Sequence, residues 1–258
     1  MQHNFKKQFG QNFLQHLEWV ERLVEAADLD KNDVVIEIGP GDGVVTERIA
    51  QSAKKITSLE IDDELIPVLN EKLQNYDNIE IVPIDVLQWD QTSLGDINYK
   101  VVASLPYNIS KKIINKFLTS ANPPIQMALL IQKEVAYDYV AKKPDATFLG
   151  TVAKIYADIE LTTTVPNNAF FPMPKVDGGI LKFTNIKPKT SEPEELIKFI
   201  KIGYSAPRKK LSSNLANIGY QKADIEKTLT ALNLSATARP QELDLNDWQE
   251  LELKLKHK

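Results

Sequence analysis

The sequence contains no cysteine, few histidines and no long apolar run, and each absence excludes a class of function. Without cysteine among its 258 residues, the chain has no disulfide, thiolate zinc site, iron–sulfur cluster or thiolate for covalent attack on a pyrimidine. The histidines, His3, His16 and His257, lie near the two ends, so we assign them no catalysis and expect no metal site. No apolar run approaches the roughly 20 residues that span a bilayer, and residues 1–7 lack the apolar core of a secretory signal. These absences predict a cytoplasmic protein with no membrane partner, and a monomer is the default expectation.

The charge distribution limits how the chain can bind a polyanion. Its net charge is −4, but residues 188–258 carry 12 Lys/Arg against 10 Asp/Glu, a net of +2 that leaves −6 for residues 1–187. Basic residues gather at Lys6-Lys7, Lys111-Lys112, Lys142-Lys143 and Arg208-Lys209-Lys210. Any binding to RNA must therefore come from local patches and depend strongly on salt.

Apolar spacing predicts alternating strands and helices over the first two thirds of the chain. The expected strands are 33–39, 55–62, 79–83, 100–104 and 126–132, and the expected helices are 17–27, 44–53, 63–74, 110–120, 133–141 and 147–156. This order predicts a mainly parallel α/β sheet covered by helices on both faces. Residues 158–165 and 178–183 alternate like a hairpin that closes the sheet edge. Between them the prolines of residues 168–174 predict a segment without regular structure.

The C-terminal part has a different pattern. Residues 185–193 are polar, contain Pro188 and Pro193, and are typical of a linker. Helical spacing follows over 194–204, 208–218, 222–232 and 246–256. We therefore predict a cofactor-binding catalytic domain over residues 1–187 and a small helical domain over residues 188–258.

A glycine loop follows the first predicted strand of the sheet. Gly39, Gly41 and Gly43 alternate in Glu37-Ile38-Gly39-Pro40-Gly41-Asp42-Gly43, and such spacing lets the backbone turn tightly and approach a ligand. The loop lacks the lysine and spacing of a P-loop, and the G-x-G-x-x-G expected for a nicotinamide cofactor is absent. Glu60 ends the next strand, where a carboxylate can accept from ribose hydroxyls, and Asp85 follows the third, where it can accept from an adenine amino group. Together these features favour an adenosine pocket, with S-adenosylmethionine as the best candidate, over a plain strand-to-helix turn.

A second polar loop, Ser104-Leu105-Pro106-Tyr107-Asn108-Ile109-Ser110, follows the fourth strand. The lone pair of an adenine amino group is delocalised into the ring, so methylation needs acceptors around its two N–H bonds. A short polar side chain and the carbonyl before Pro106 would supply them, and the ring of Tyr107 would stack on the base. Positioning and fixed dipoles then suffice for direct transfer, without a metal or a covalent intermediate.

With these motifs the chain resembles the ribosomal RNA adenine N6,N6-dimethyltransferases, and specifically the bacterial small-subunit enzymes. Residues 7–14, 37–43, 104–109 and 170–176, together with Glu60 and Asp85, follow the order and spacing of that family. The resemblance implies a Rossmann-like class I methyltransferase sheet, dimethylation of two adjacent adenosines and docking on the immature small ribosomal subunit. It implies a cofactor site of Gln11, Asn12, Leu14, Glu37, Gly39, Gly41, Gly43, Glu60, Ile61, Asp85, Val86 and Ser104, and a catalytic set of Ser104, Leu105, Pro106, Tyr107 and Phe171. Tyr107 and Phe171 would clamp a flipped adenine, while one of Phe170 and Phe171 is expected in the core.

The C-terminal residues 203–211 and 239–243 also resemble the family, in its helical RNA-binding domain. Ser104 stands where the family usually has asparagine, and Pro207 where it tends to have a second arginine. A serine hydroxyl is shorter and both donates and accepts, so the number of methyl groups transferred stays open. Three alternatives remain: a large-subunit ribosomal RNA methylase, an inactive ribosome-assembly factor, and a DNA adenine or protein glutamine methylase. Leu105 disfavours the last, because those enzymes usually carry Asp/Asn-Pro-Pro-Tyr.

Overall fold

The chain divides into two compact units. The structure, a computed structural model, describes residues 12–188 and 193–256. The first unit comprises Met1–Tyr137 and Ala157–Lys189, and the second comprises Asp138–Tyr156 and Thr190–Lys258. In the described ranges, no helix is both long enough and apolar enough to span a bilayer.

The first unit is built around one large sheet. Its strands are β2 (Val34–Ile38), β3 (Lys55–Glu60), β4 (Ile79–Pro83), β5 (Tyr99–Ser104), β6 (Gln126–Gln132), β7 (Asp158–Val165) and β9 (Gly178–Thr184). Its helices are α1 (Leu17–Glu25), α2 (Val44–Ala50), α3 (Leu65–Lys72), the short η2 (Gln91–Leu94), α4 (Ser110–Leu118), the start of α5 (Lys133–Val140) and η3 (Asn167–Ala169). The predicted strands and helices are thus present, with ends that differ by a few residues.

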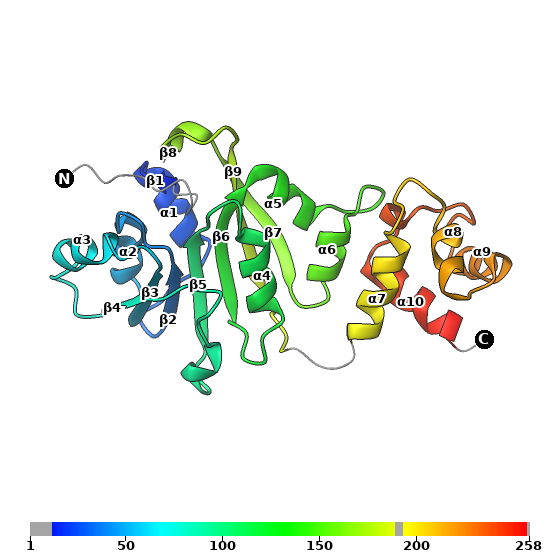
Figure 1. The fold of residues 1–258 in the computed structure, drawn as a ribbon, viewed down its shortest axis with the longest axis horizontal. Helices are drawn as coiled ribbons and strands as arrows, with labels where there is room; N and C mark the ends of the chain where they lie inside the picture. The colour runs from blue at the N-terminus through cyan, green and yellow to red at the C-terminus, as the bar shows by residue number, and fades with distance from the viewer. Residues whose placement is uncertain (1–11, 189–192, 257–258) are drawn as a thin grey trace. The chain divides into compact units, whose positions relative to one another are not determined.

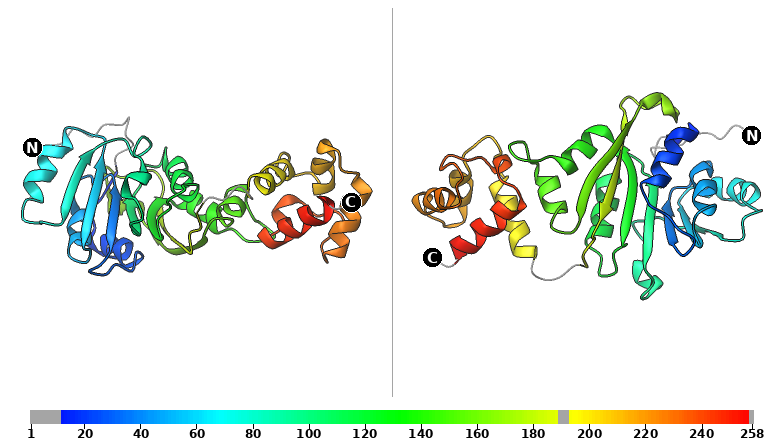
Figure 2. Two further views of the ribbon diagram at one scale, coloured as in Figure 1. Left: turned by 90° about the horizontal axis from the view of Figure 1, so that it is seen from below. Right: turned by 180° about the vertical axis from the view of Figure 1, so that it is seen from behind.

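The strands lie in the order β4-β3-β2-β5-β6-β9-β7. The first five run parallel, and β9 is antiparallel to both β6 and β7. The predicted parallel sheet with a closing hairpin is therefore confirmed. Figure 1 shows α4 in front of this sheet, and the view from behind in Figure 2 shows α1 over its other face. The strands after β2 are added first on one side, as β3 and β4, and then on the other side, as β5 and β6. Such a switch in strand order forms a crevice at the carboxyl ends of the strands.

Alternation of apolar side chains explains why the central strands are covered on both faces. In β2, Val35 packs in a cluster with α1 and α2, while the neighbouring Ile36 and Ile38 are buried outside that cluster. On α4, the spacing of Ile113 and Phe117 gives the helix one fully buried face. A parallel strand buried on both faces needs a nearly continuous apolar run, which is what β2, β5 and β6 have.

The segment predicted to lack regular structure contains a short strand. β8 (Phe170–Phe171) pairs antiparallel with β1 (Phe13–Leu14), in the register Phe13 to Phe171 and Leu14 to Phe170. The prediction for residues 168–174 was therefore wrong at this point. The prolines stop the strand after Phe171, but the preceding residues have free N–H groups that a distant segment can pair with.

The second unit is a set of helices around its own core. It contains the end of α5, α6 (Phe148–Ala153), α7 (Pro193–Gly203), α8 (Leu211–Leu215), η4 (Ala216–Ile218), α9 (Lys222–Ala231), η5 (Pro240–Glu242) and α10 (Leu245–Lys256). Trp248 is fully buried in this core. The helix predicted over 208–218 begins only at Leu211, because a turn closed by the Lys209 N–H and the Ala206 carbonyl precedes it.

The compact units differ from the division at residue 187 in one respect. Asp138–Tyr156 groups with the C-terminal helices instead of the sheet. Within this unit, the hydroxyl of Tyr204 donates to the Ala146 carbonyl at 3.1 Å, and the N–H of Ala146 donates to the Gln241 carbonyl at 3.0 Å. The functional assignment of the two parts, cofactor binding and RNA binding, stays a prediction.

Candidate functional site

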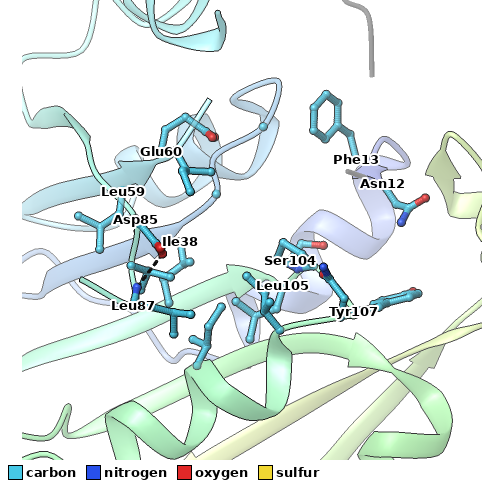
Figure 3. A pocket seen from close by; sticks show the side chains of 18 of the residues that line it. Asn12, Phe13, Ile38, Leu59, Glu60, Asp85, Leu87, Ser104, Leu105 and Tyr107 are labelled. Carbon is cyan, nitrogen blue, oxygen red and sulfur yellow. Dashed lines mark hydrogen bonds between the residues drawn. The ribbon is translucent and has the colours of Figure 1, made fainter. Parts of the chain in front are cut away.

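A cavity of about 260 Å³ lies at the carboxyl ends of β2, β3, β4 and β5. Its lining residues are Asn12, Phe13, Ile38, Gly39, Gly41, Leu59, Glu60, Ile61, Leu65, Ile84, Asp85, Val86, Leu87, Ser104, Leu105, Pro106, Tyr107, Asn108, Ile109, Ile113 and Phe170. Figure 3 shows Glu60 and Asp85 on one side of this cavity and Ser104 and Tyr107 on the other. The predicted cofactor loop and the predicted catalytic loop therefore share one cavity.

The glycine loop adopts a backbone that other residues rarely take. Gly39, Gly41 and Gly43 have φ angles of 66°, 60° and 80°, all in the left-handed region that favours glycine. A Cβ atom on Gly41 would also lie 2.9 Å from Cδ1 of Phe13. Gly43 does not line the cavity; it caps the start of α2, and a Cβ atom there would lie 3.1 Å from Cδ2 of Leu69. The backbone conformation thus favours glycine at all three positions, and close packing also favours it at Gly41 and Gly43.

Glu60 ends β3 and is almost fully buried in the cavity wall. Its Oε1 accepts a 2.8 Å hydrogen bond from the N–H of Asp62. Burial raises the pKa of Glu60 above its usual value, and the backbone N–H groups of Asp62, Ile61 and Gly41 oppose that rise. A carboxylate has about four acceptor positions, so Glu60 retains capacity for hydroxyl groups of a ligand.

Asp85 follows β4 and lines the cavity beside two apolar residues. Its Oδ1 accepts from the N–H of Leu87 at 2.8 Å, and its Oδ2 accepts no hydrogen bond from the described residues. Val86 is buried, whereas the side chain of Ile61 is 46% exposed. This end of the cavity therefore combines apolar surface with a carboxylate oxygen that accepts from none of the described residues, a combination that suits an aromatic ring bearing an amino group.

Glu37 lies in a smaller adjoining cavity, which is also lined by Leu14, Gly39, Gly41 and Ser104. Its Oε2 accepts from the hydroxyl of Ser58 at 2.7 Å, while Oε1 has no hydrogen-bond partner among the described residues. Burial raises the pKa of Glu37 to about 7; the hydroxyls of Ser58 and Thr46 oppose this rise, and the carboxylates of Glu60 and Asp42 add a smaller increase. A buried oxygen without a partner is costly, and a bound cationic or N–H group would offset that cost.

The loop after β5 presents polar groups that have no partner within the described ranges. They are the hydroxyl of Ser104, the carbonyl oxygen of Leu105 and the hydroxyl of Tyr107. The loop itself is held in place, because the N–H of Leu105 donates to the Leu130 carbonyl at 2.9 Å and the Pro106 carbonyl accepts from Ser110 at 3.1 Å. Burial raises the pKa of Tyr107 to about 12, so its ring is a neutral phenol at physiological pH.

The two adjacent phenylalanines of β8 have different environments. Phe170 is buried, lines the cavity and meets the ring of Tyr107 edge-on, with ring centroids 6.5 Å apart and planes at 71°. Phe171 is 53% exposed and does not line the cavity, but it pairs with Phe13, which does. The expectation that one of the pair belongs to the core is confirmed, with Phe170 as the core residue.

Most of the predicted site residues meet at these two cavities, with Gly43 and Phe171 next to them. Gln11 lies outside the described residues. Sequence reasoning missed several lining residues, among them Phe13, Leu59, Asn108 and Phe170. Phe13, Asn108 and Phe170 lie inside the motifs of residues 7–14, 104–109 and 170–176, and this position was the signal that could have identified them. The roles of the individual residues stay predictions.

The fold is similar to that of known ribosomal RNA methyltransferases. The 23S rRNA methyltransferase ErmE matches with a TM-score of 0.81 and 24% identity, over 95% of this chain and all of that one (100%). A dimethyladenosine transferase from Plasmodium falciparum matches with a TM-score of 0.78 and 23% identity, over 95% of this chain and 98% of that one. The predicted fold class, a Rossmann-like methyltransferase sheet with C-terminal helices, is thereby confirmed.

Similarity in sequence extends along nearly the whole chain. Ribosomal RNA small subunit methyltransferase A of Dehalococcoides mccartyi is 35% identical over 253 residues, covering 95% of this chain and 87% of the relative. The protein of the same name from Mycoplasma mobile is also 35% identical, over 95% of this chain and 96% of the relative. The family model described as ribosomal RNA adenine dimethylase matches residues 2–249. The chain belongs to the ribosomal RNA adenine dimethylase family.

Proposed function

We propose that the chain transfers methyl groups from S-adenosylmethionine to the exocyclic amino group of adenine in small-subunit ribosomal RNA. The observation that carries this proposal is the shared cavity, in which the glycine loop, Glu60 and Asp85 lie across from the Ser104–Tyr107 loop. Family membership and the small-subunit names of the relatives favour the same reaction. By analogy with the family name, we propose two methyl groups on each of two adjacent adenosines.

S-adenosylmethionine matches the chemistry of the residues present. Glu60 would hold the ribose hydroxyls, and the free Oδ2 of Asp85 would accept from the adenine amino group of the cofactor. The unpartnered Oε1 of Glu37 would face the positively charged end of the molecule. Gly39 lines the cavity with no atom within 4 Å of the position that a Cβ would take, so the backbone there is open to a ligand. When bound, the cofactor supplies a methyl group on a sulfonium centre, a strong electrophile.

The catalytic loop would prepare the target nitrogen. The hydroxyl of Ser104 and the carbonyl of Leu105 would accept from its two N–H bonds and favour a pyramidal nitrogen with an available lone pair. Neutral Tyr107 would stack on the base, and exposed Phe171 would close over its other side. Because these groups are held by the backbone before substrate binds, little reorganisation is needed during the reaction.

The partner would be the immature small ribosomal subunit, met in the cytoplasm by a monomer of this chain. A net charge of −4 gives no general attraction to RNA, so docking would depend on local basic patches and on the shape of the RNA.

Methyl transfer to defined particles tests the proposal. The purified chain is incubated with methyl-labelled S-adenosylmethionine and with immature small subunits, mature small subunits or large subunits in parallel. We expect label in adenosine from the immature small subunit. Label in large-subunit RNA instead would assign the chain to that substrate. If the chain bound the cofactor but labelled no RNA, the remaining interpretation would be an inactive ribosome-assembly factor.

A further inference from the structure

The second unit contains a groove of about 850 Å³ that is separate from the candidate site. All of its lining residues belong to that unit. One wall is Phe148 at the start of α6, and another is formed by Ile202, Tyr204 and Pro207 at and after the end of α7. Gln241 of η5 completes the lining.

Two aromatic side chains give this groove an aromatic wall. The ring of Tyr204 stacks on Trp248 with centroids 5.7 Å apart and planes at 28°, and its hydroxyl donates to the Ala146 carbonyl at 3.1 Å. Phe148 meets Tyr204 edge-on at 5.9 Å and 65°, and its side chain is 36% exposed. Exposed aromatic rings on a rigid support are the surfaces on which unpaired bases stack.

Polar groups in the groove are also left without partners. The Oε1 atom of Gln241 is buried and has no hydrogen bond from the described residues. Asp145 lines the groove, is exposed and forms no ion pair among those residues. An amide oxygen and a carboxylate beside aromatic rings can accept from the amino and ring N–H groups of a base.

One basic residue lines the groove and others follow its lining residues in the chain. Lys201 lines it, and Pro207 leads directly into the exposed run Arg208-Lys209-Lys210. A 2.8 Å hydrogen bond from the Leu211 N–H to the Ala238 carbonyl brings this run beside Arg239. None of these basic residues forms an ion pair within the described ranges.

Two other lysines of the same unit are neutralised by ion pairs. Lys143 pairs with Asp244 at 2.6 Å and with Asp247 at 3.0 Å, and Lys256 pairs with Glu252 at 2.9 Å. The cations near the groove thus remain available for phosphates, and a polyanion is the occupant that their charge favours.

We propose that this groove binds one unpaired nucleotide of the RNA substrate. Its base would lie against Phe148 and Tyr204, and the adjoining phosphates would meet Lys201 and Arg208. The proposal rests on the proposed function, because it takes the RNA substrate as the source of the nucleotide. It assigns to the C-terminal unit a contact with an RNA base, in addition to contacts with the phosphates and sugars of the RNA backbone.

Binding of a short RNA to the full chain, without cofactor, tests this assignment. The probe is a labelled single-stranded RNA of about eight nucleotides, compared with an abasic strand of the same length and charge. We expect the base-containing strand to bind about fivefold or more tightly, the effect of stacking one base. Phe148→Leu keeps the apolar volume and should remove this preference. Lys201→Gln should weaken the binding of both strands. Lys227→Gln on α9, at a lysine that is also exposed and has no ion pair with the described residues, should change neither.

Cross-linking locates the base independently. A strand carrying 5-iodouridine should form adducts at Phe148 or Tyr204, mapped by mass spectrometry of the digested chain. Adducts confined to Tyr107 and Phe171, or an unchanged base preference in a folded Phe148→Leu protein, would overturn the proposal. Equally tight binding of an acidic peptide that competes with the RNA would assign the groove to a protein partner. Because no methyl transfer is measured, an inactive chain that still shows the base preference would separate this proposal from the proposed reaction.

Discussion

The carboxylate of Glu37 accepts a 2.7 Å hydrogen bond from Ser58 through one oxygen and has no partner among the described residues for the other. Both side chains are buried, one on β2 and the other on the neighbouring β3. A buried acid that is only half satisfied is suited to a cationic ligand, and in the free protein its ionised form is disfavoured. Several consequences of this site can be measured.

The first prediction concerns stability and pH in the free protein. Burial raises the pKa of Glu37 from 4.5 to about 7, so between these values the unfolded chain has lost a proton that the folded chain keeps. The free energy of unfolding should therefore fall as pH rises through this window. Glu37→Gln should remove the effect and gain about 2 kcal/mol relative to the parent chain between about pH 5 and about pH 8. Urea denaturation at the two pH values measures it; parallel changes in both proteins would contradict the prediction.

The second prediction concerns the ribose contact of Glu60. Glu60→Ala should weaken S-adenosylmethionine binding by about 1.5–3 kcal/mol, because the ribose hydroxyls lose a charged acceptor. This corresponds to a Kd roughly ten to a hundred times higher, measured by isothermal titration calorimetry. Glu71→Ala, an exposed glutamate on α3 outside the cavity, should bind like the parent chain. An unchanged Kd for Glu60→Ala would show that the ribose lies elsewhere.

The third prediction concerns Ser104, at the position where the resemblance to the family leads us to expect asparagine. Asparagine reaches further from the backbone and carries a carbonyl acceptor, so Ser104→Asn should raise the ratio of dimethylated to monomethylated adenosine. Ser104→Ala, which has no acceptor, should lower both products by about tenfold or more. Nucleoside mass spectrometry after a fixed reaction time gives the ratios. If Ser104→Ala matched the parent chain, the hydroxyl would have no role at the target nitrogen.

The fourth prediction concerns the loop that carries Phe171. Asp177 accepts from the Asn167 N–H at 3.1 Å through Oδ1 and from the Lys133 ammonium at 3.1 Å through Oδ2, so it ties the two ends of this loop together and to α5. Asp177→Ala should raise the KM for RNA about fivefold and leave the Kd for S-adenosylmethionine unchanged. Asp177→Asn, which keeps an acceptor for Asn167, should have a smaller effect. A variant that weakened cofactor binding and RNA binding equally would point to general destabilisation instead.

Local patterns in the sequence were sufficient for the sheet and for the polar ends of its strands. Glu60 and Asp85 stand at the ends of strands that alternate with helices along the chain, an order typical of a parallel sheet, so their carboxylates were expected at one edge. The pairing of β1 with β8 was not predictable in this way, because it joins residues more than 150 positions apart in the chain. The apolar lining of the cavity has the same composition as the core, so residues such as Leu59 gave no separate signal.

Helical spacing also does not reveal which core a helix joins. Phe148–Ala153 has the pattern of a helix on the sheet, yet it groups with the C-terminal unit. Its place depends on contacts such as that between Tyr204 and Ala146, which link distant positions. The helix predicted from residue 208 starts three residues later for a local reason: a turn closed by the Lys209 N–H and the Ala206 carbonyl precedes it, and the first apolar residue of its pattern is Leu211 itself.

The most direct measurement is the identity of the modified nucleoside. Immature small subunits lacking adenine methylation are incubated with the purified chain and S-adenosylmethionine, and their RNA is digested and analysed by mass spectrometry. We expect N6,N6-dimethyladenosine, absent when Glu60→Ala replaces the parent chain at low cofactor concentration. Binding of S-adenosylmethionine with no methylated adenosine in any ribosomal RNA would contradict the proposed function.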